Sequence, residues 1–217
     1  MSKDVVRALE ETVSQHHLLK HEFYQAWTAG QLPIDRLQRY AVRYYPHVAA
    51  FPRYISAMHS RCPDIETRQV LLENLVEEES GADNHPELWL RFAESLGVSR
   101  EDVTDAEPVP AADSLVGTFH GLAANGPLAQ GLAALFIYEH QIPPIAAAKI
   151  DGLRQWYGIN DERGLEFFRV HKEADVWHSS AVAGLLEKHV TDKTDADDAV
   201  EGGRRAMAAL WGMLDAV

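Results

Sequence analysis

Hydrophobic and polar residues follow a helical period along almost the whole chain. Between Ser2 and Trp27, apolar side chains recur at steps of three to six residues, a spacing that gathers them on one face of a helix. Gly30 marks the expected end of this helix. The strict apolar-polar alternation typical of half-buried strands is not evident in any segment. The pattern therefore predicts an all-α protein.

Proline, glycine and capping residues divide the rest of the chain into further helices. A first-turn proline, Pro33, should open a second helix that runs to about Tyr45, with kinks or restarts at Pro46 and Pro52. The remaining expected helices are Ile65 to Ser80, His85 to Gly97, Asp113 to Asn125, Pro127 to Tyr157 with a kink at Pro143-Pro144, Asp161 to His189, and Ala196 to the end. We expect residues 1–217 to form a single bundle of about seven to eight helices, with 98–112 as the longest connection.

Composition and charge exclude several classes of protein. With 20 Lys and Arg against 33 Asp and Glu, the net charge is −13, which argues against nucleic acid and anionic membranes as partners. Cys62 is the only cysteine, so a disulfide framework and CxxC metal or redox motifs are absent. The longest apolar run, Leu132 to Tyr138, is too short to span a bilayer, and the N-terminus lacks an apolar signal core. We expect a soluble, cytoplasmic protein.

The strongest chemical signal is the segment HKEADVWH. His171, Asp175 and His178 stand at positions i, i+4 and i+7, so one stripe of a helix presents two imidazoles and a carboxylate. A mixed nitrogen and oxygen set of this kind suits iron, manganese or zinc. The alternative is a solvated helix face that carries these residues by chance.

Two further groups of acids are unusual for purely structural positions. Glu77, Glu78 and Glu79 stand at a predicted helix C-terminus, where negative charge opposes the helix dipole, and His85 follows. We expect one of these acids to point inward toward a cation and two to be solvated. Glu139 lies in the most apolar window of the chain, where a carboxylate is costly unless it is paired or binds metal. A buried Arg or Tyr partner would be the alternative explanation for Glu139.

Together these segments offer three carboxylates and three imidazoles. Their charge of −3 nearly offsets the +4 of two divalent cations, and paired redox metals in helix bundles commonly activate O₂. No Glu in the chain has a His three residues later, so the ferritin-type ligand pattern is absent. The six candidate ligands are Glu78, His85, Glu139, His171, Asp175 and His178.

Tyrosines and one lysine accompany the candidate ligands. Lys149 is bracketed by alanines and an isoleucine, and an apolar setting would lower the pKa of its amine and free it as a nucleophile. The alternative is a lysine whose amine reaches the surface. Buried tyrosines usually supply core area and one hydrogen bond, but they can be oxidised beside a high-valent metal. Tyr138 adjoins Glu139, and the first two predicted helices carry Tyr24, Tyr40, Tyr44 and Tyr45.

The order and spacing of these motifs resemble a known family. HEFYQAW, LQRYAVRYYPHVAAFPRYISAMHSRC, LLENLVEEESG, NHPELW, YEHQIPPIA and HKEADVWH span residues 18–178. They resemble the haem-oxygenase-like di-metal oxidases of the TenA/PqqC-like superfamily, and more narrowly the chlamydial protein associating with death domains and related para-aminobenzoate synthases. The resemblance implies a haem-oxygenase-like, TenA-like helical bundle, and it places the family's metal ligands on the same six residues.

The resemblance also implies a reaction. An Fe/Fe or Mn/Fe pair would activate O₂ with an external reductant to make para-aminobenzoate for folate biosynthesis. The enzyme's own Tyr24 would supply the ring, Lys149 is the suspected amine source, and Tyr40 and Tyr138 would act nearby. The superfamily usually forms homodimers. His140 stands where a relative has serine, and the Cys-rich tail of the chlamydial form is absent, so death-domain binding is not expected.

Other functions stay open at this point. A PqqC-like or di-metal oxidase could act on an exogenous small molecule, and a non-catalytic binding module could use the acidic helical surface. A TenA-like thiamin hydrolase is less expected because Cys62 lacks the context of its nucleophile. Formation of product without an added organic substrate would separate these possibilities.

Overall fold

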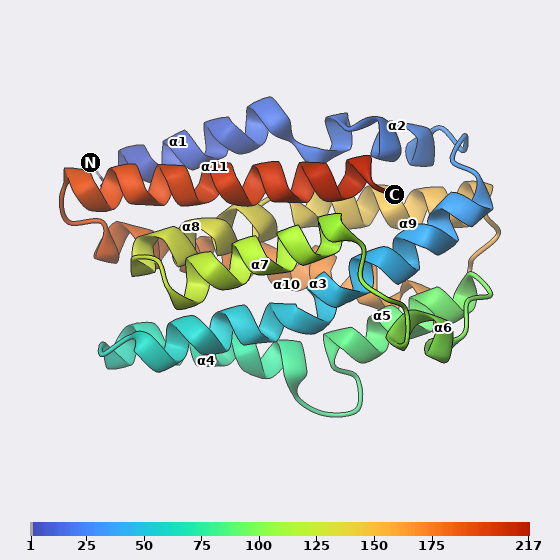
Figure 1. Cartoon of the computed structure of the whole chain (residues 1–217), viewed down its shortest axis with the longest axis horizontal. Coiled ribbons are helices and arrows are strands. Elements are labelled where there is room, and N and C mark those ends of the chain that lie inside the picture. Colours follow the sequence, from blue (N-terminus) through green and yellow to red (C-terminus); the bar gives the residue numbers. More distant parts are fainter. Residues whose placement is uncertain (1) are drawn as a thin grey trace.

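The structure, a computed structural model, describes residues 2–217 apart from the side chains of residues 173, 174 and 176. Within this range the elements are helices joined by turns and loops, more of them than the seven to eight expected (Figure 1). They are α1 (Ser2–His16), the 3-10 helix η1 (Leu18–Lys20), α2 (Glu22–Thr28), α3 (Ile34–Arg61), α4 (Ile65–Glu79), α5 (His85–Ser95), α6 (Arg100–Thr104), α7 (Pro110–Ala124), α8 (Leu128–Glu139), α9 (Ile142–Trp156), α10 (Glu162–His189) and α11 (Lys193–Asp215).

The N-terminal segment is split where one helix was expected. Two histidines cause the break, because their side chains compete for backbone donors. The side chain of His17 accepts a hydrogen bond from the amide of Leu19, and that of His21 accepts one from the amide of Phe23. Each histidine therefore caps a new helix, and α1, η1 and α2 replace a single helix.

The predicted break near Tyr45 is wrong, because α3 continues through Pro46 and Pro52 as one helix. A proline removes one amide donor from the helical ladder and strains the preceding turn. Helix α3 packs against α4, α5 and α7, and its apolar side chains before and after the two prolines are buried in the core. This packing stabilises α3 as one helix.

The long helix expected between Pro127 and Tyr157 is instead two helices. α8 ends at Glu139 and α9 begins at Ile142, so the Pro143-Pro144 pair lies in the first turn of α9. Proline is well tolerated there, because first-turn amides have no partner within the helix. The break leaves Glu139 at the end of α8, free to face neighbouring helices. The connection expected at 98–112 contains α6 and the start of α7.

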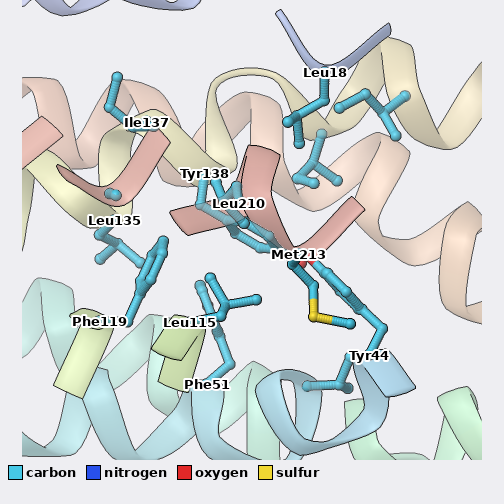
Figure 2. Close-up of a cluster of buried hydrophobic side chains, with 14 of the residues drawn as sticks. Leu18, Tyr44, Phe51, Leu115, Phe119, Leu135, Ile137, Tyr138, Leu210 and Met213 are labelled. Atoms are coloured by element: carbon cyan, nitrogen blue, oxygen red, sulfur yellow. The ribbon is translucent and has the colours of Figure 1, made fainter. Parts of the chain in front are cut away.

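Helix α8 occupies the centre of the bundle. It is buried on nearly all sides and packs against α11, α10 and α7 (Figure 1). Gly202 and Gly203 of α11 allow the close approach, since a Cβ at Gly202 would lie 2.8 Å from the Cα of Gln130. Figure 2 shows part of the core to which α8 contributes, with Phe119, Leu135 and Leu210 among its members. No helix in the described part of the chain is long and apolar enough to cross a membrane.

Candidate metal centre

Four helices bring the six candidate ligands into the core. Glu78 comes from the last turn of α4, His85 is the first residue of α5, and Glu139 is the last residue of α8. α10 supplies the other three ligands at its i, i+4 and i+7 positions. The exposed fraction is between 1% and 6% for each of Glu78, His85, Glu139, His171, Asp175 and His178.

The six side chains form two triads, each with ligand atoms within 4.8 Å of one another. The first triad is Glu78, His85 and His171, and the second triad is Glu139, Asp175 and His178. The solvated-face alternative for the histidines and aspartate of α10 is therefore wrong. The structure brings together all six residues that the sequence indicated, while their role as ligands stays a prediction.

Contacts within the first triad leave nitrogen atoms available for a metal. His171 Nδ1 donates a hydrogen bond to the carbonyl oxygen of Phe167 at 2.6 Å, so the lone pair of its neutral ring is on Nε2. His85 Nδ1 lies 2.7 Å from Glu78 Oε2, yet it has no hydrogen-bond partner within the described residues. The two imidazole rings lie 4.2 Å apart. The carboxylate and imidazole groups of this triad therefore lie close together without a well-aligned hydrogen bond between His85 and Glu78. A bound cation would satisfy these atoms.

The second triad carries buried atoms that lack partners. Glu139 Oε2, Asp175 Oδ2 and both ring nitrogens of His178 have no hydrogen-bond partner among the described residues. Buried polar groups are nearly always satisfied, and an unpaired buried carboxylate is expensive. The donor set of two carboxylates and one imidazole fits a divalent cation, and the first triad fits a second one.

The electrostatics of the site point the same way. Burial raises the pKa of Glu139 well above its usual range, and the charge of Asp175 adds to the effect. Burial also raises the pKa of Asp175 to about 6. The pKa of His171 falls well below its usual value, because burial disfavours the charged ring and His85 adds repulsion. Without a cation, ionisation of the Glu139 and Asp175 carboxyl groups is therefore unfavourable. A bound metal ion would stabilise their charged forms.

One residue near the ligands, Asn74, was not indicated by the sequence. Asn74 Nδ2 donates a hydrogen bond to Glu139 Oε1 at 2.7 Å, and this contact orients the carboxylate. Asn74 lies four residues before Glu78 on α4, so helical spacing could have indicated it. Of the three adjacent acids, Glu78 points inward as predicted. Glu77 is half exposed, but its Oε2 also lies 3.0 Å from His178 Nε2.

A buried aromatic group lies beside the first triad. Lys149 is 5% exposed, so the surface alternative for it is wrong. Its Nζ donates a hydrogen bond to the Tyr40 hydroxyl at 2.8 Å and lies 5.4 Å from the centre of the Tyr24 ring. Burial lowers the pKa of Lys149 to about 7. The hydroxyls of Tyr24 and Tyr40 lie 3.4 Å apart, and burial raises the pKa of both phenols.

Two small cavities lie beside this aromatic group and the first triad. One, of about 10 Å³, is lined by Tyr24, Lys149, Tyr138 and His171 among others. A second, also of about 10 Å³, is lined by Tyr138, His171 and ligands of the first triad. Tyr44 points toward Tyr138 (Figure 2) and also lines the first cavity, a placement that the sequence did not indicate. Tyr138 and His171 thus border both spaces.

Comparison with known proteins gives relatives along the full chain. The family of iron-containing redox enzymes matches residues 38–211. The chain is 43% identical to a 4-aminobenzoate synthase of Chlamydia pneumoniae, covering 96% of this chain and 92% of that one. It is 41% identical to a 4-aminobenzoate synthase of Nitrosomonas europaea, covering 96% and 89%. It is 26% identical to a pyrroloquinoline-quinone synthase of Ectopseudomonas mendocina, covering 97% and 85%.

Solved structures share the fold at low sequence identity. A TenA homologue from Pseudomonas syringae pv. tomato matches with a TM-score of 0.84 and 16% identity, over 98% of this chain and 90% of that one. A protein from Shewanella denitrificans with a haem-oxygenase-like fold matches with a TM-score of 0.75 and 17% identity, over 99% and 88%. These matches confirm the TenA-like, haem-oxygenase-like bundle, and the sequence matches show that the chain belongs to the family of iron-containing redox enzymes.

Proposed function

We propose that this protein is a dinuclear metal oxygenase that makes para-aminobenzoate (4-aminobenzoate), with its own Tyr24 as the source of the ring. The observation that carries the proposal is the placement of Tyr24, Tyr40 and Lys149 in one buried group that shares a cavity with His171. The names of relatives at 41% and 43% identity support the same activity.

The two triads are the proposed metal sites, each for one ion of an Fe/Fe or Mn/Fe pair. When bound, such a pair supplies oxidising power from O₂ and an external reductant. The donor set carries three negative charges against four positive ones, so the buried centre would be nearly neutral. Asn74 and the Phe167 carbonyl hold Glu139 and His171 in place from outside the triads.

Tyr24 is the proposed sacrificed side chain. Its phenol is buried and its pKa is raised by burial, so it stays protonated at neutral pH. Removal of an electron from the ring therefore requires that the phenolic proton leave as well. The nearest acceptor that the structure provides is the Tyr40 hydroxyl oxygen at 3.4 Å. Tyr138 borders the same cavity and also lines the second cavity beside the first triad.

Lys149 is the proposed source of nitrogen. An ammonium group has no lone pair and cannot form a bond to carbon, whereas a neutral amine can. Because burial lowers its pKa to about 7, about half of the Lys149 side chains are neutral at that pH. The rings of Tyr40 and Phe168, each 5.0 Å from Nζ, keep water away from the amine. Each chain would then form product about once.

Isotopic labelling tests the proposal directly. Protein labelled with ¹³C in its tyrosine rings and ¹⁵N in its lysine side chains is purified without oxygen and loaded with Fe(II), with or without Mn(II). O₂ and a reductant are then added without any organic substrate. We expect para-aminobenzoate that carries both labels, at no more than one per chain. Tyr24→Phe should bind metal but yield no product, and Tyr45→Phe, a partly buried tyrosine of α3, is the matched control.

The alternative of an exogenous substrate makes the opposite prediction. Protein shown to hold two metals would then form no product until a small organic molecule is added. The cavity beside His171, of about 10 Å³, is far smaller than the several hundred Å³ typical of pockets for organic ligands. This favours a reacting group that is already part of the chain.

Assembly, location and electron supply complete the proposal. We propose a homodimer in the cytoplasm that draws electrons from a separate reductant or reductase and needs no nucleic acid, membrane or death-domain partner. Sedimentation equilibrium of the metal-loaded protein checks the dimer, and a mass of one chain would contradict it.

A further inference from the structure

The six candidate ligands are almost closed to solvent, so metal ions need a route to them. One side of the second triad, between α4 and α10, carries two side chains that are half exposed. Glu77 of α4 and Trp177 of α10 are each 50% exposed, and both contact His178, which is 1% exposed. This is where the buried centre approaches the surface of the described structure.

The contact between Glu77 and His178 has the geometry of two ligands of one ion. Glu77 Oε2 lies 3.0 Å from His178 Nε2, yet this nitrogen has no hydrogen-bond partner among the described residues. Metal bonds of 2.0–2.2 Å that meet at a right angle place their donor atoms about 3 Å apart. The oxygen and the nitrogen can therefore hold the same cation without a large movement.

Charge favours the same role. A hydrated divalent cation loses water when it enters a buried site, and a carboxylate at the surface replaces that water before the cation is fully enclosed. Glu77 adds a fourth negative charge to the three of the triads, which matches the charge of two divalent ions. The chain carries a net charge of −13, so its surface attracts cations in general.

We propose that Glu77 is a metal-capture ligand, which binds a divalent cation from solvent together with His178 and passes it to Glu139 and Asp175. This inference rests on the proposed metal centre, but it does not depend on the reaction that the centre performs. Glu77 stands outside the two triads and binds the cation during loading.

The rate of metal loading tests this proposal, and Trp177 provides the signal. Its ring lies 5.4 Å from that of His178, so a paramagnetic ion at the second triad should quench its fluorescence. Metal-free protein is mixed with Co(II) in a stopped-flow instrument, and Trp177→Phe identifies the part of the signal that comes from this residue. We expect Glu77→Gln to slow loading about tenfold, the lower end of electrostatic steering effects. The final metal content should be unchanged.

Glu79→Gln is the matched control. Glu79 is an exposed acid two residues along α4 with no ion pair in the described part of the chain, and its substitution removes the same charge. We expect loading of this variant within twofold of the unmodified protein. Equal slowing of both variants would show a general charge effect and overturn the proposal. An unchanged loading rate with faster Co(II) release from Glu77→Gln would also overturn it, because Glu77 would then only position His178.

The two proposals fail separately. Loading is measured without O₂, so an absence of para-aminobenzoate from loaded protein would contradict the proposed reaction and leave the loading rates as they are. Normal product from Glu77→Gln that loads at the unmodified rate would contradict metal capture alone.

Discussion

Replacement of Lys149 by methionine should make the metal-free protein more stable at neutral pH. Lys149 is buried, its Nζ lies 5.0 Å from the ring centres of Tyr40 and Phe168, and it donates a hydrogen bond to the Tyr40 hydroxyl. Among the described side chains no carboxylate forms an ion pair with its amine, and burial lowers its pKa. Methionine keeps an unbranched, flexible side chain in the same space and needs no charge or solvation.

The magnitude follows from the pKa. A shift from 10.5 to about 7 corresponds to about 5 kcal/mol of unfavourable free energy for the charged form in the folded state. The lost hydrogen bond to Tyr40 and the imperfect fit of methionine offset about 2 kcal/mol of this. Lys149→Met should therefore gain about 3 kcal/mol at pH 7, which for a chain of this size raises Tm by about 6–12 °C.

The gain must depend on pH in one direction. Between pH 7 and 10.5 the unfolded chain binds a proton at Lys149 that the folded chain does not, so the stability of the unmodified protein rises with pH across this window. The difference between the variant and the unmodified protein should thus be largest at or below pH 7 and should fall to zero near about pH 9, where the remaining charge penalty equals the offset of about 2 kcal/mol. Above about pH 9 the unmodified protein should be the more stable of the two. Urea denaturation of both proteins at pH 6.5, 8 and 9.5 measures this difference.

Two results would refute the reasoning. If Lys149→Met were less stable than the unmodified protein at every pH, the amine would be a net stabilising group. A difference that does not change with pH would show that the native amine titrates as it does in the unfolded chain. Lys3→Met, at an exposed lysine, is the control and should show neither effect. A stabilised variant that makes no para-aminobenzoate would indicate that Lys149 is retained for chemistry at the expense of stability.

Three further predictions concern the metal centre and the packing. His171→Ala should fold but lose one metal per chain by elemental analysis, and full occupancy would contradict its place in the first triad. Affinity for Co(II) should fall as pH decreases from 8 to 6, because only neutral imidazoles bind metal. Burial lowers the pKa of His85, but the negative charge of Glu78 has the opposite effect, and the net result is a raised pKa. A pH-independent affinity would contradict this. Gly202→Ala should cost about 1–3 kcal/mol in urea denaturation, since its Cβ would meet the α8 backbone at 2.8 Å, whereas Gly212→Ala, in open space, should not.

Local sequence patterns were enough to predict the fold class and several of the candidate ligands. The three ligands of α10 share a face because 3.6 residues per turn bring positions i, i+4 and i+7 together, whatever the rest of the chain does. Glu139 was identified because a carboxylate in an apolar run needs a partner wherever the run is buried. Helical periodicity and the motif order also predicted the fold class, which the structural matches confirm.

Contacts between helices required the tertiary structure. The division of six ligands into two triads depends on how α4, α5, α8 and α10 pack, and no spacing within one helix encodes that arrangement. The continuity of α3 through Pro46 is likewise decided by its burial, which outweighs the local preference of proline. Lys149 could have reached solvent by its sequence context, but the rings around it close that path. The sequence offers no reason to distinguish Glu77 from other acids at a helix end. Only the packing of α4 against α10 places it beside His178.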